Sequence, residues 1–311
     1  MQRLEYALEI KKTLQRSNFN VSEYCRSGTF NIVARKGSLL LFIKLLLNIG
    51  AIRYEVAKEL KMVSKFLKGV PITICKRSGT SKIENGAVYL RHYVPIISER
   101  TFEELVVDNM PYVYAMPGGF YARIDFEKMK KIRRLRKISL GEIARAVGVS
   151  RKAVQLYEQG MKPEIETALR LESFIGKSIL LPIDISSYTQ SEERFETDLE
   201  KLEFFERIVF NRLSKLGYEV LPTSKSPFNG LTKNKKETFI TYISENEKLL
   251  IKKIHVIASI SNVIKRMCVF FVKNSDLKNF SGIPIITWKD LKATSPEAVR
   301  EIILERAKKW I

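Results

Sequence analysis

At 311 residues the chain has room for two or three domains, and its 45% hydrophobic and 10% aromatic content excludes a disordered protein. Three separated cysteines and two histidines exclude a disulfide framework and a histidine-rich metal centre, and the longest apolar run is too short to span a bilayer. The formal net charge of +20 favours a polyanionic partner such as nucleic acid.

Residues 1–110 have the pattern of an α/β domain. The expected elements are a helix over 3–16, strands over 19–21, 28–34 and 38–47, a helix over 52–67, strands over 70–75, 87–90 and 94–97, and a short helix over 101–107. The strand over 38–47 is apolar on both faces, as a central strand should be. The order α-β-β-β-α-β predicts helices packed on a mixed sheet.

This order, with FNIVA in one strand and a long apolar strand containing a lysine after it, resembles the core of the restriction-endonuclease and Holliday-junction-resolvase superfamily. Nucleases of that superfamily hold a metal with an aspartate at the start of one strand and an acid-x-lysine trio on the next. Here the aspartate position is Asn31, the acid position is Phe42, and only Lys44 is kept. An amide and a phenyl ring cannot form the carboxylate cluster that Mg²⁺ requires. We therefore expect a nuclease-like fold with no catalytic residues, metal or cofactor.

Residues 111–123 are expected to form a hairpin that connects this domain to the next. Apolar and aromatic residues alternate on both sides of a Pro-Gly-Gly sequence at residues 117–119. Alternation around such turn residues is typical of two antiparallel strands.

Residues 124–181 have the pattern of an all-α helix-turn-helix domain. Ser139 and Glu142 form a capping box that begins one helix, and Gly148 can take the left-handed conformation that ends it. Ser150 then caps a second helix over residues 150–159. The spacing of these caps predicts two short helices joined by a tight turn.

The apolar residues around these caps predict how the helices pack. Two short helices that cross steeply need a small residue where they approach, which Ala144 supplies, and Val154 turns the second helix back toward the core. The remaining expected core residues are Phe126, Met129, Ile132, Leu135, Val149, Tyr157, Ile165, Ala168, Leu169 and Phe174. A packed core of this kind predicts that the polar side chains of the second helix face outward.

At these residues the sequence resembles the Cro/repressor-like helix-turn-helix family, with GVSRKAVQLYEQG in the position of its recognition helix. In that family the second helix enters the major groove of DNA. The outward residues Arg151, Lys152 and Gln155 are therefore expected to read bases. The expected phosphate contacts are Lys130, Lys131, Arg133, Arg134, Lys137 and Ser150.

An antiparallel helix pair without a nucleic-acid role is the alternative interpretation of this domain. The charge of the segment favours DNA. Between Tyr121 and Lys162, twelve Lys and Arg residues face four Asp and Glu residues. Such a local excess of positive charge is typical of a surface that contacts phosphates.

Residues 182–194 are polar and rich in turn formers, which predicts a linker. Residues 195–311 then repeat six landmarks of the first domain in the same order. Phe228-Asn229 matches Phe30-Asn31, and Ile283–Thr287 matches Val94–Ser98. The second copy also has an asparagine in place of the acid, so both domains are expected to be catalytically inactive scaffolds.

Over nearly its full length the chain resembles an archaeal family of transcriptional regulators in which a Cro-like helix-turn-helix lies between two nuclease-like domains. The stretches that carry the resemblance are FNIVARKGSLLLFIKLLLNI, GGFYARID, LRKISLGEIARAVGVSRKAVQLYEQGM and GIPII. The family implies sequence-specific binding of double-stranded DNA and transcriptional control, without enzymatic activity. Superfamily members commonly pair through the nuclease-like fold, so we expect a homodimer.

Two alternatives of other classes stay open. The protein is an architectural or adaptor protein if its flanking domains bind another protein and the central domain only tethers them to DNA. An active metal-dependent nuclease is disfavoured by Asn31, Phe42 and Asn229. Because residues 1–12 carry acids in an amphipathic helix and have no signal-peptide core, we expect a cytoplasmic protein without a membrane partner.

Overall fold

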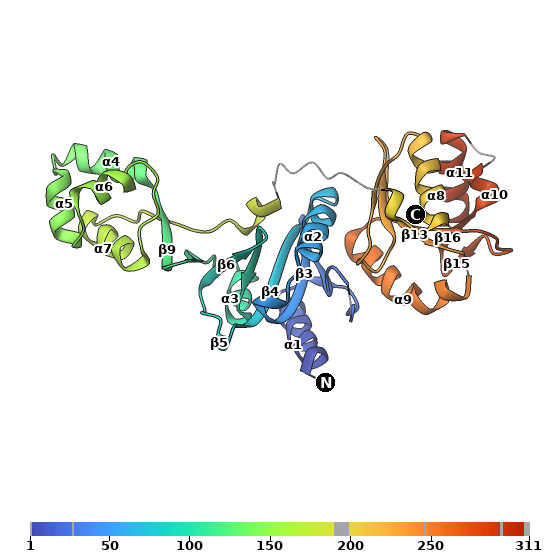
Figure 1. Cartoon of the computed structure of the whole chain (residues 1–311), viewed down its shortest axis with the longest axis horizontal. Coiled ribbons are helices and arrows are strands. Elements are labelled where there is room, and N and C mark those ends of the chain that lie inside the picture. Colours follow the sequence, from blue (N-terminus) through green and yellow to red (C-terminus); the bar gives the residue numbers. More distant parts are fainter. Residues whose placement is uncertain (1, 27, 190–198, 246, 293–294, 308–311) are drawn as a thin grey trace. The chain divides into compact units, whose positions relative to one another are not determined.

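The computed structural model describes residues 2–26, 28–189, 199–245, 247–292 and 295–307 (Figure 1). The chain forms two compact units that do not follow the order of the sequence. The first contains residues 1–45, 52–71 and 189–311, and the second contains residues 46–51 and 72–188. The N-terminal strands therefore group with the C-terminal part of the chain, and the helix-turn-helix segment lies wholly in the second unit.

The N-terminal part of the first unit is a helix-flanked antiparallel layer. Its elements are α1 (Gln2–Arg16), β1 (Asn20–Val21), β2 (Ile32–Lys36), β3 (Leu39–Asn48) and α2 (Tyr54–Phe66). The last residues of β3 and the 3-10 turn that follows it (Ile49–Ala51) belong to the second unit. β2 pairs with β1 on one side and with β3 on the other, both antiparallel. Gly37, with φ of 58°, makes the tight turn between β2 and β3. β3 is buried along most of its length, as its continuous apolar sequence predicts.

The C-terminal part of the first unit has the order α-β-β-β-α-β followed by a hairpin and two helices. Its elements are a 3-10 turn (Leu199–Lys201), α8 (Phe204–Lys215), β11 (Glu219–Pro222), β12 (Gly230–Lys233), β13 (Thr238–Ser244), α9 (Glu247–Ile264), β14 (Cys268–Val272), β15 (Asn279–Phe280), β16 (Ile283–Thr287), α10 (Trp288–Lys292) and α11 (Pro296–Arg306). The strands form a mixed sheet in the order β11-β12-β13-β14-β16-β15. β14 pairs in parallel with both neighbours and is buried at every residue, so it is the centre of the sheet.

The second unit begins with a mixed sheet that leads into the helical domain. Its strands and short helix are β4 (Val70–Ser78), β5 (Ser81–Lys82), β6 (Ala87–Arg91), β7 (Val94–Ile97), α3 (Glu99–Leu105), β8 (Val113–Met116), β9 (Gly119–Ile124) and β10 (Leu180–Leu181). The strand order is β4-β7-β6-β8-β9-β10, with β5 paired to β4. β8 and β9 form the hairpin expected from the sequence, and β9 runs directly into the first helix of the helix-turn-helix domain.

Four helices make up the helix-turn-helix domain. They are α4 (Phe126–Leu135), α5 (Leu140–Val147), α6 (Arg151–Tyr157) and α7 (Ile165–Ile175), and a 3-10 turn (Ile185–Thr189) follows them. Their shared core contains Ala144 and Val154, as the sequence predicts, together with Ile143, Val147, Leu171 and Ile175. The expected linker over 182–194 lies outside the described residues from 190 onward.

Three residues that the sequence pattern assigns to this core are exposed instead. Leu135 is 73% exposed, Leu169 50% and Phe174 39%. Phe126 and Leu135 are nine residues apart, which is two and a half helical turns, so they point to opposite sides of α4. In α7, Ala168, Leu171 and Ile175 follow the helical period and take the buried positions. Within the described ranges, every helix is too short or too polar to cross a lipid bilayer.

Candidate nucleic-acid interface

The start and end of α5 are fixed by hydrogen bonds. The Ser139 hydroxyl accepts from the backbone N–H of Glu142 at 3.1 Å, and the Glu142 carboxylate accepts from the backbone N–H of Ser139 at 2.6 Å. These bonds lower the pKa of the Glu142 carboxyl. Gly148 ends the helix in the left-handed conformation, with φ of 73° and ψ of 35°. The residues expected to shape the turn therefore take those positions.

The second helix of the pair, α6, presents its polar side chains to solvent. The Ser150 hydroxyl caps it by accepting from the backbone N–H of Ala153 at 3.1 Å. Val154 and Tyr157 are buried in the domain core. Arg151, Lys152 and Gln155 are exposed, and within the described residues their side chains make no ion pair or hydrogen bond. The spacing i, i+1, i+4 places the three on one outward face.

Arg133 is placed differently from the expectation that it contacts phosphate. Its guanidinium donates two hydrogen bonds to the Glu158 carboxylate, at 2.6 and 2.9 Å, and both side chains are largely buried. These hydrogen bonds to the Glu158 carboxylate raise the pKa of Arg133. This forked ion pair joins α4 to the end of α6, so Arg133 positions α6 in the domain. The sequence pattern predicts no role for Glu158, although it is the one acid in the 150–159 segment.

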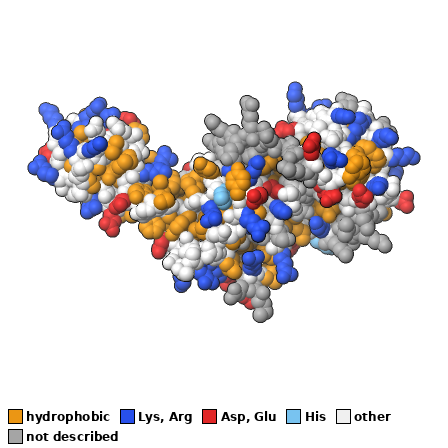
Figure 2. Space-filling model, in the orientation of Figure 1, with side chains coloured by type: hydrophobic (Ala, Val, Ile, Leu, Met, Phe, Trp, Pro, Cys, Tyr) orange, Lys and Arg blue, Asp and Glu red, His pale blue; other side chains and the backbone are white. Residues whose placement is uncertain are grey.

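The other expected phosphate contacts lie on and after α4. Lys131, Arg134 and Lys137 are exposed, and Lys130 is half-buried. Arg136, between them, donates to the carbonyl of Ile175 at 2.7 Å and so ties α4 to the end of α7. Figure 2 shows Lys and Arg side chains spread over the surface of this domain. Four of the six residues expected at phosphates thus keep their charge available on α4 and the turn after it.

Asn31, Phe42 and Lys44, which the sequence places at the positions of the nuclease motif, pack or hydrogen-bond within the fold. Asn31 is 4% exposed; its amide donates to the carbonyl of Cys25 at 2.7 Å and accepts from the backbone N–H of Leu45 at 2.9 Å. Phe42 is fully buried against another phenyl ring. The Lys44 ammonium donates to the carbonyl of Gly28, and its burial, reinforced by the charge of Arg3, lowers its pKa to about 8.

Beside these residues, a buried carboxylate on α2 binds a loop from the C-terminal part of the chain. Glu59, 8% exposed, accepts from the Thr29 hydroxyl at 2.5 Å. It also accepts from the backbone N–H of Ser224 at 2.8 Å and from the Ser226 hydroxyl at 2.7 Å. The backbone N–H of Lys225 lies 3.1 Å from the same carboxylate. Loop 224–226 is therefore anchored to α2 and, through Glu59, to the segment that precedes Asn31.

The C-terminal sheet contains an asparagine with corresponding bonds. Asn229 accepts from the backbone N–H of Ile243 at 2.9 Å and donates to the carboxyl of Glu206. Burial raises the pKa of that carboxyl. Both Asn31 and Asn229 thus connect the start of one strand to the backbone of the next. Within the described ranges, no three His, Cys, Asp or Glu side chains are grouped to hold a metal ion.

Comparison with known families matches two separate segments of the chain. A family described as a PD-(D/E)XK superfamily domain matches residues 3–112, and a helix-turn-helix family matches residues 129–181. These matches confirm the nuclease-like and helix-turn-helix resemblances that the sequence predicts. None of the solved structures matches the chain.

Several archaeal proteins are similar to the chain over almost its whole length. A protein of Methanococcoides burtonii is 33% identical over 97% of the chain and 96% of its own length. One from Methanosarcina mazei is 34% identical over 92% of both chains, and one from Picrophilus torridus is 31% identical over 98% of both. Each of the three is named "Putative HTH-type transcriptional regulatory protein".

Proposed function

Because this chain belongs to the archaeal family of HTH-type transcriptional regulatory proteins, we propose that it binds double-stranded DNA sequence-specifically and controls transcription. The observation that carries the proposal is the exposed face of α6. Arg151, Lys152 and Gln155 stand on a helix whose start is capped and whose other face is buried. Arginine and glutamine can each make paired contacts, to guanine and adenine edges respectively.

The phosphate contacts in this proposal come from α4 and the residues that follow it. Lys130, Lys131, Arg134 and Lys137 supply positive charge, and the Ser150 hydroxyl can donate to a phosphate while it caps α6. Arg133 is left out of this set, since its guanidinium is held by Glu158. Phosphate contacts set the affinity for any duplex, whereas the α6 face sets the preference among sequences.

We also propose that both nuclease-like domains are catalytically inactive, with residues 195–311 as the second copy of the fold. The corresponding bonds of Asn31 and Asn229 support this interpretation. Purified protein is expected to leave duplex, single-stranded and branched DNA intact in the presence of Mg²⁺. Magnesium-dependent nicking that disappears in Lys44→Ala would contradict the proposal.

The proposed regulator is a homodimer, because one recognition helix reads only a few base pairs and dimers gain affinity from two half-sites. The face of α2 around Glu59 is occupied by the chain's own loop 224–226, so a second copy has to bind another surface of the α/β domains. Light scattering should give about twice the chain mass of 35.9 kDa. A mass near one chain, with and without DNA, would rule the dimer out.

Selection of bound sequences from random duplex DNA at near-physiological salt tests the central proposal. A regulator that reads bases through α6 should enrich one defined sequence, and Gln155→Ala should change which base is preferred at one position. Genomic binding should then be confined to a few promoters. No enrichment, together with broad genomic occupancy, would instead indicate an architectural protein that is only tethered to DNA.

A further inference from the structure

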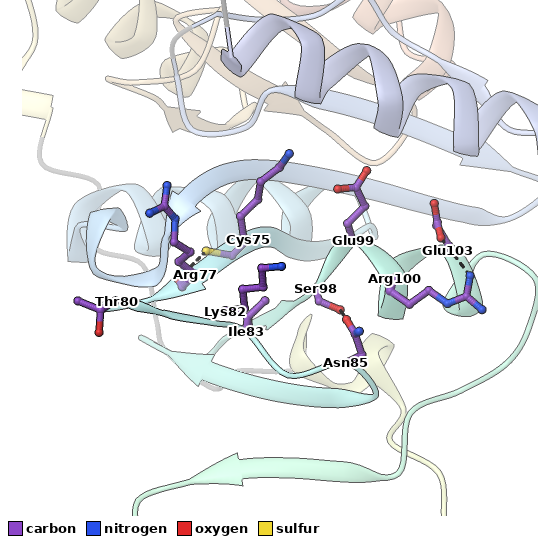
Figure 3. Close-up of a pocket in the computed structure, with 11 residues that line it drawn as sticks. Cys75, Arg77, Thr80, Lys82, Ile83, Asn85, Ser98, Glu99, Arg100 and Glu103 are labelled. Atoms are coloured by element: carbon purple, nitrogen blue, oxygen red, sulfur yellow. Dashed lines mark hydrogen bonds and ion pairs between the residues drawn. The ribbon is translucent and has the colours of Figure 1, made fainter.

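We propose that the cavity at the carboxyl ends of β4 and β7 binds a small phosphorylated ligand of nucleotide size. The cavity has a volume of about 740 Å³, within the usual range for small-molecule sites. β4 and β7 pair in parallel, with Ile74 opposite Ile97, so both strands deliver their next residues to the same edge (Figure 3). Sheets with parallel strands bind ligands at that edge as a general rule.

Two cations, Arg77 and Lys82, line one wall of the cavity from neighbouring strands. Arg77 on β4 and Lys82 on β5 are directly opposite in the antiparallel register, so their side chains leave the same face of the ladder. Like charges in this arrangement are unfavourable. Within the described part of the chain, neither side chain makes an ion pair. A phosphate group between them would remove the repulsion and accept hydrogen bonds from both.

The opposite wall contains the acids Glu99 and Glu103, and the second lies close to a cation. Arg100 on α3 pairs with Glu104 at 3.1 Å and lies 3.6 Å from Glu103. Figure 3 shows Arg100 directed toward Glu103 and Lys82 directed toward the middle of the lining residues. Lys82 therefore points into the cavity and Arg77 lines its wall, while Arg100 is engaged by acids of its own helix.

The floor of the cavity is neutral and able to donate hydrogen bonds. Ser98, 5% exposed, donates to the Asn85 carbonyl oxygen at 2.7 Å, which leaves the Asn85 amide NH₂ as a donor on the wall. The Cys75 thiol donates to a backbone carbonyl at 3.3 Å, and burial raises its pKa, so it stays protonated. A neutral donor floor below two cations suits a phosphate ester better than a cationic or wholly apolar ligand.

The cavity is in the same compact unit as the helix-turn-helix domain. The sheet that carries it continues from β7 through β6 and β8 to β9. β9 ends at Ile124, and the next residue, Asp125, caps α4 by accepting from the backbone N–H of Lys128 at 2.9 Å. An effector role for the ligand rests on the DNA-binding function proposed above, whereas ligand binding itself does not.

Calorimetric titration of the full chain with inorganic pyrophosphate and with adenosine monophosphate tests the site without DNA. Wild-type protein should bind at least one of the two probes saturably, and Arg77→Ala or Lys82→Ala should weaken that binding about tenfold or more. Arg91→Ala is the matched control, because Arg91 is an exposed cation of the same sheet outside the cavity. Its affinity should stay within about twofold of wild type.

The absence of saturable binding by wild-type protein overturns the proposal, as does an equal loss in Arg91→Ala. Measuring duplex binding by the same variants shows whether Arg77 and Lys82 bind the small ligand or the phosphates of DNA. If Arg77→Ala and Lys82→Ala weakened duplex binding and left pyrophosphate and nucleotide binding unchanged, these cations would serve DNA and the proposal would fail. If the protein binds pyrophosphate or adenosine monophosphate but does not bind DNA, the ligand site stands and only the proposed DNA-binding function fails.

Discussion

The helix-turn-helix domain and the nuclease-like fold use their polar residues in opposite ways. On α6, Arg151 and Gln155 are exposed and have no partner among the described residues. In the first unit, Asn31 and Glu59 are buried, and their side chains are hydrogen-bonded to neighbouring groups of the protein. A polar group with no partner keeps its capacity to bind a ligand, whereas a buried and bonded one contributes to the fold.

Charge alone therefore does not identify a site in this protein. Arg133 and Arg134 are neighbours on α4, yet one is held by Glu158 and the other is exposed. The same contrast applies to Lys44, which the sequence resemblance places at the lysine position of the nuclease motif but whose ammonium binds a backbone carbonyl. Substitutions at these positions should separate effects on stability from effects on DNA binding.

The largest effect is expected from Glu59→Ala. The substitution leaves the buried donors of Thr29 and of loop 224–226 without an acceptor, so the free energy of unfolding should fall by roughly 3–5 kcal/mol. Urea denaturation measures the change. Glu55→Ala, an exposed acid on the same helix, is the control and should change stability by less than about 0.5 kcal/mol. Equal effects of the two substitutions would show that the Glu59 carboxylate is not buried in this network.

The next largest effect is expected from Arg133→Ala, which should lower the free energy of unfolding. Removing the guanidinium leaves the Glu158 carboxylate buried without its cation, which should destabilise the protein by about 2–4 kcal/mol. Arg134→Ala is the matched control: stability should stay within about 0.5 kcal/mol, while the salt slope of DNA binding falls by roughly one unit. If Arg133→Ala behaved like Arg134→Ala, Arg133 would be a phosphate contact after all.

A smaller effect is expected from substitutions on α6, and it should be confined to the binding of the preferred DNA sequence. Gln155→Ala or Arg151→Ala should weaken binding to the preferred duplex by roughly 1–3 kcal/mol and change binding to a scrambled duplex little. Each removes a base contact and leaves the phosphate contacts of α4. Binding to both duplexes across a salt series measures the difference. A parallel loss on the two duplexes would mean that α6 does not read sequence.

The smallest effect should appear as a pH dependence caused by Lys44. Burial lowers its pKa in the folded protein to about 8, below the ordinary value of 10.5. Between these values the unfolded chain holds more protons, so stability should rise with pH from about 8 to about 10.5. The rise should be roughly 1–2 kcal/mol, which is less than the full pKa shift would give because Lys44 is only partly buried and solvent screens its charge. The difference between urea curves of wild type and Lys44→Met isolates this contribution. If stability depended on pH equally in wild type and in Lys44→Met, Lys44 would not be a buried lysine that becomes charged as the pH falls.

The helix-turn-helix is predictable from its capping residues and helical periodicity, and the nuclease-like resemblance from the order and apolar pattern of its strands. Both signals depend on residues that are close together in the sequence. The capping box at Ser139 and Glu142 needs only residues three apart. The role of Arg133 could not be predicted, since its partner Glu158 is 25 residues away and a buried ion pair has the same sequence pattern as a phosphate contact. A spacing of three residues predicts Leu135 in the core, but the helical period is about 3.6 residues, so the side chain is turned away from the core and is exposed.

The bond between Glu59 and loop 224–226 also sets the order in which the protein can be completed during synthesis. Glu59 and Ser224 are 165 residues apart, and at about 5–20 residues per second the carboxylate precedes its donors by on the order of ten seconds. The helix-turn-helix core uses only residues between 122 and 180, so it can close while the ribosome is still translating the C-terminal sheet. The domain made first is therefore finished last, and a chain released early would carry a complete helix-turn-helix and an α2 whose Glu59 lacks the donors of loop 224–226.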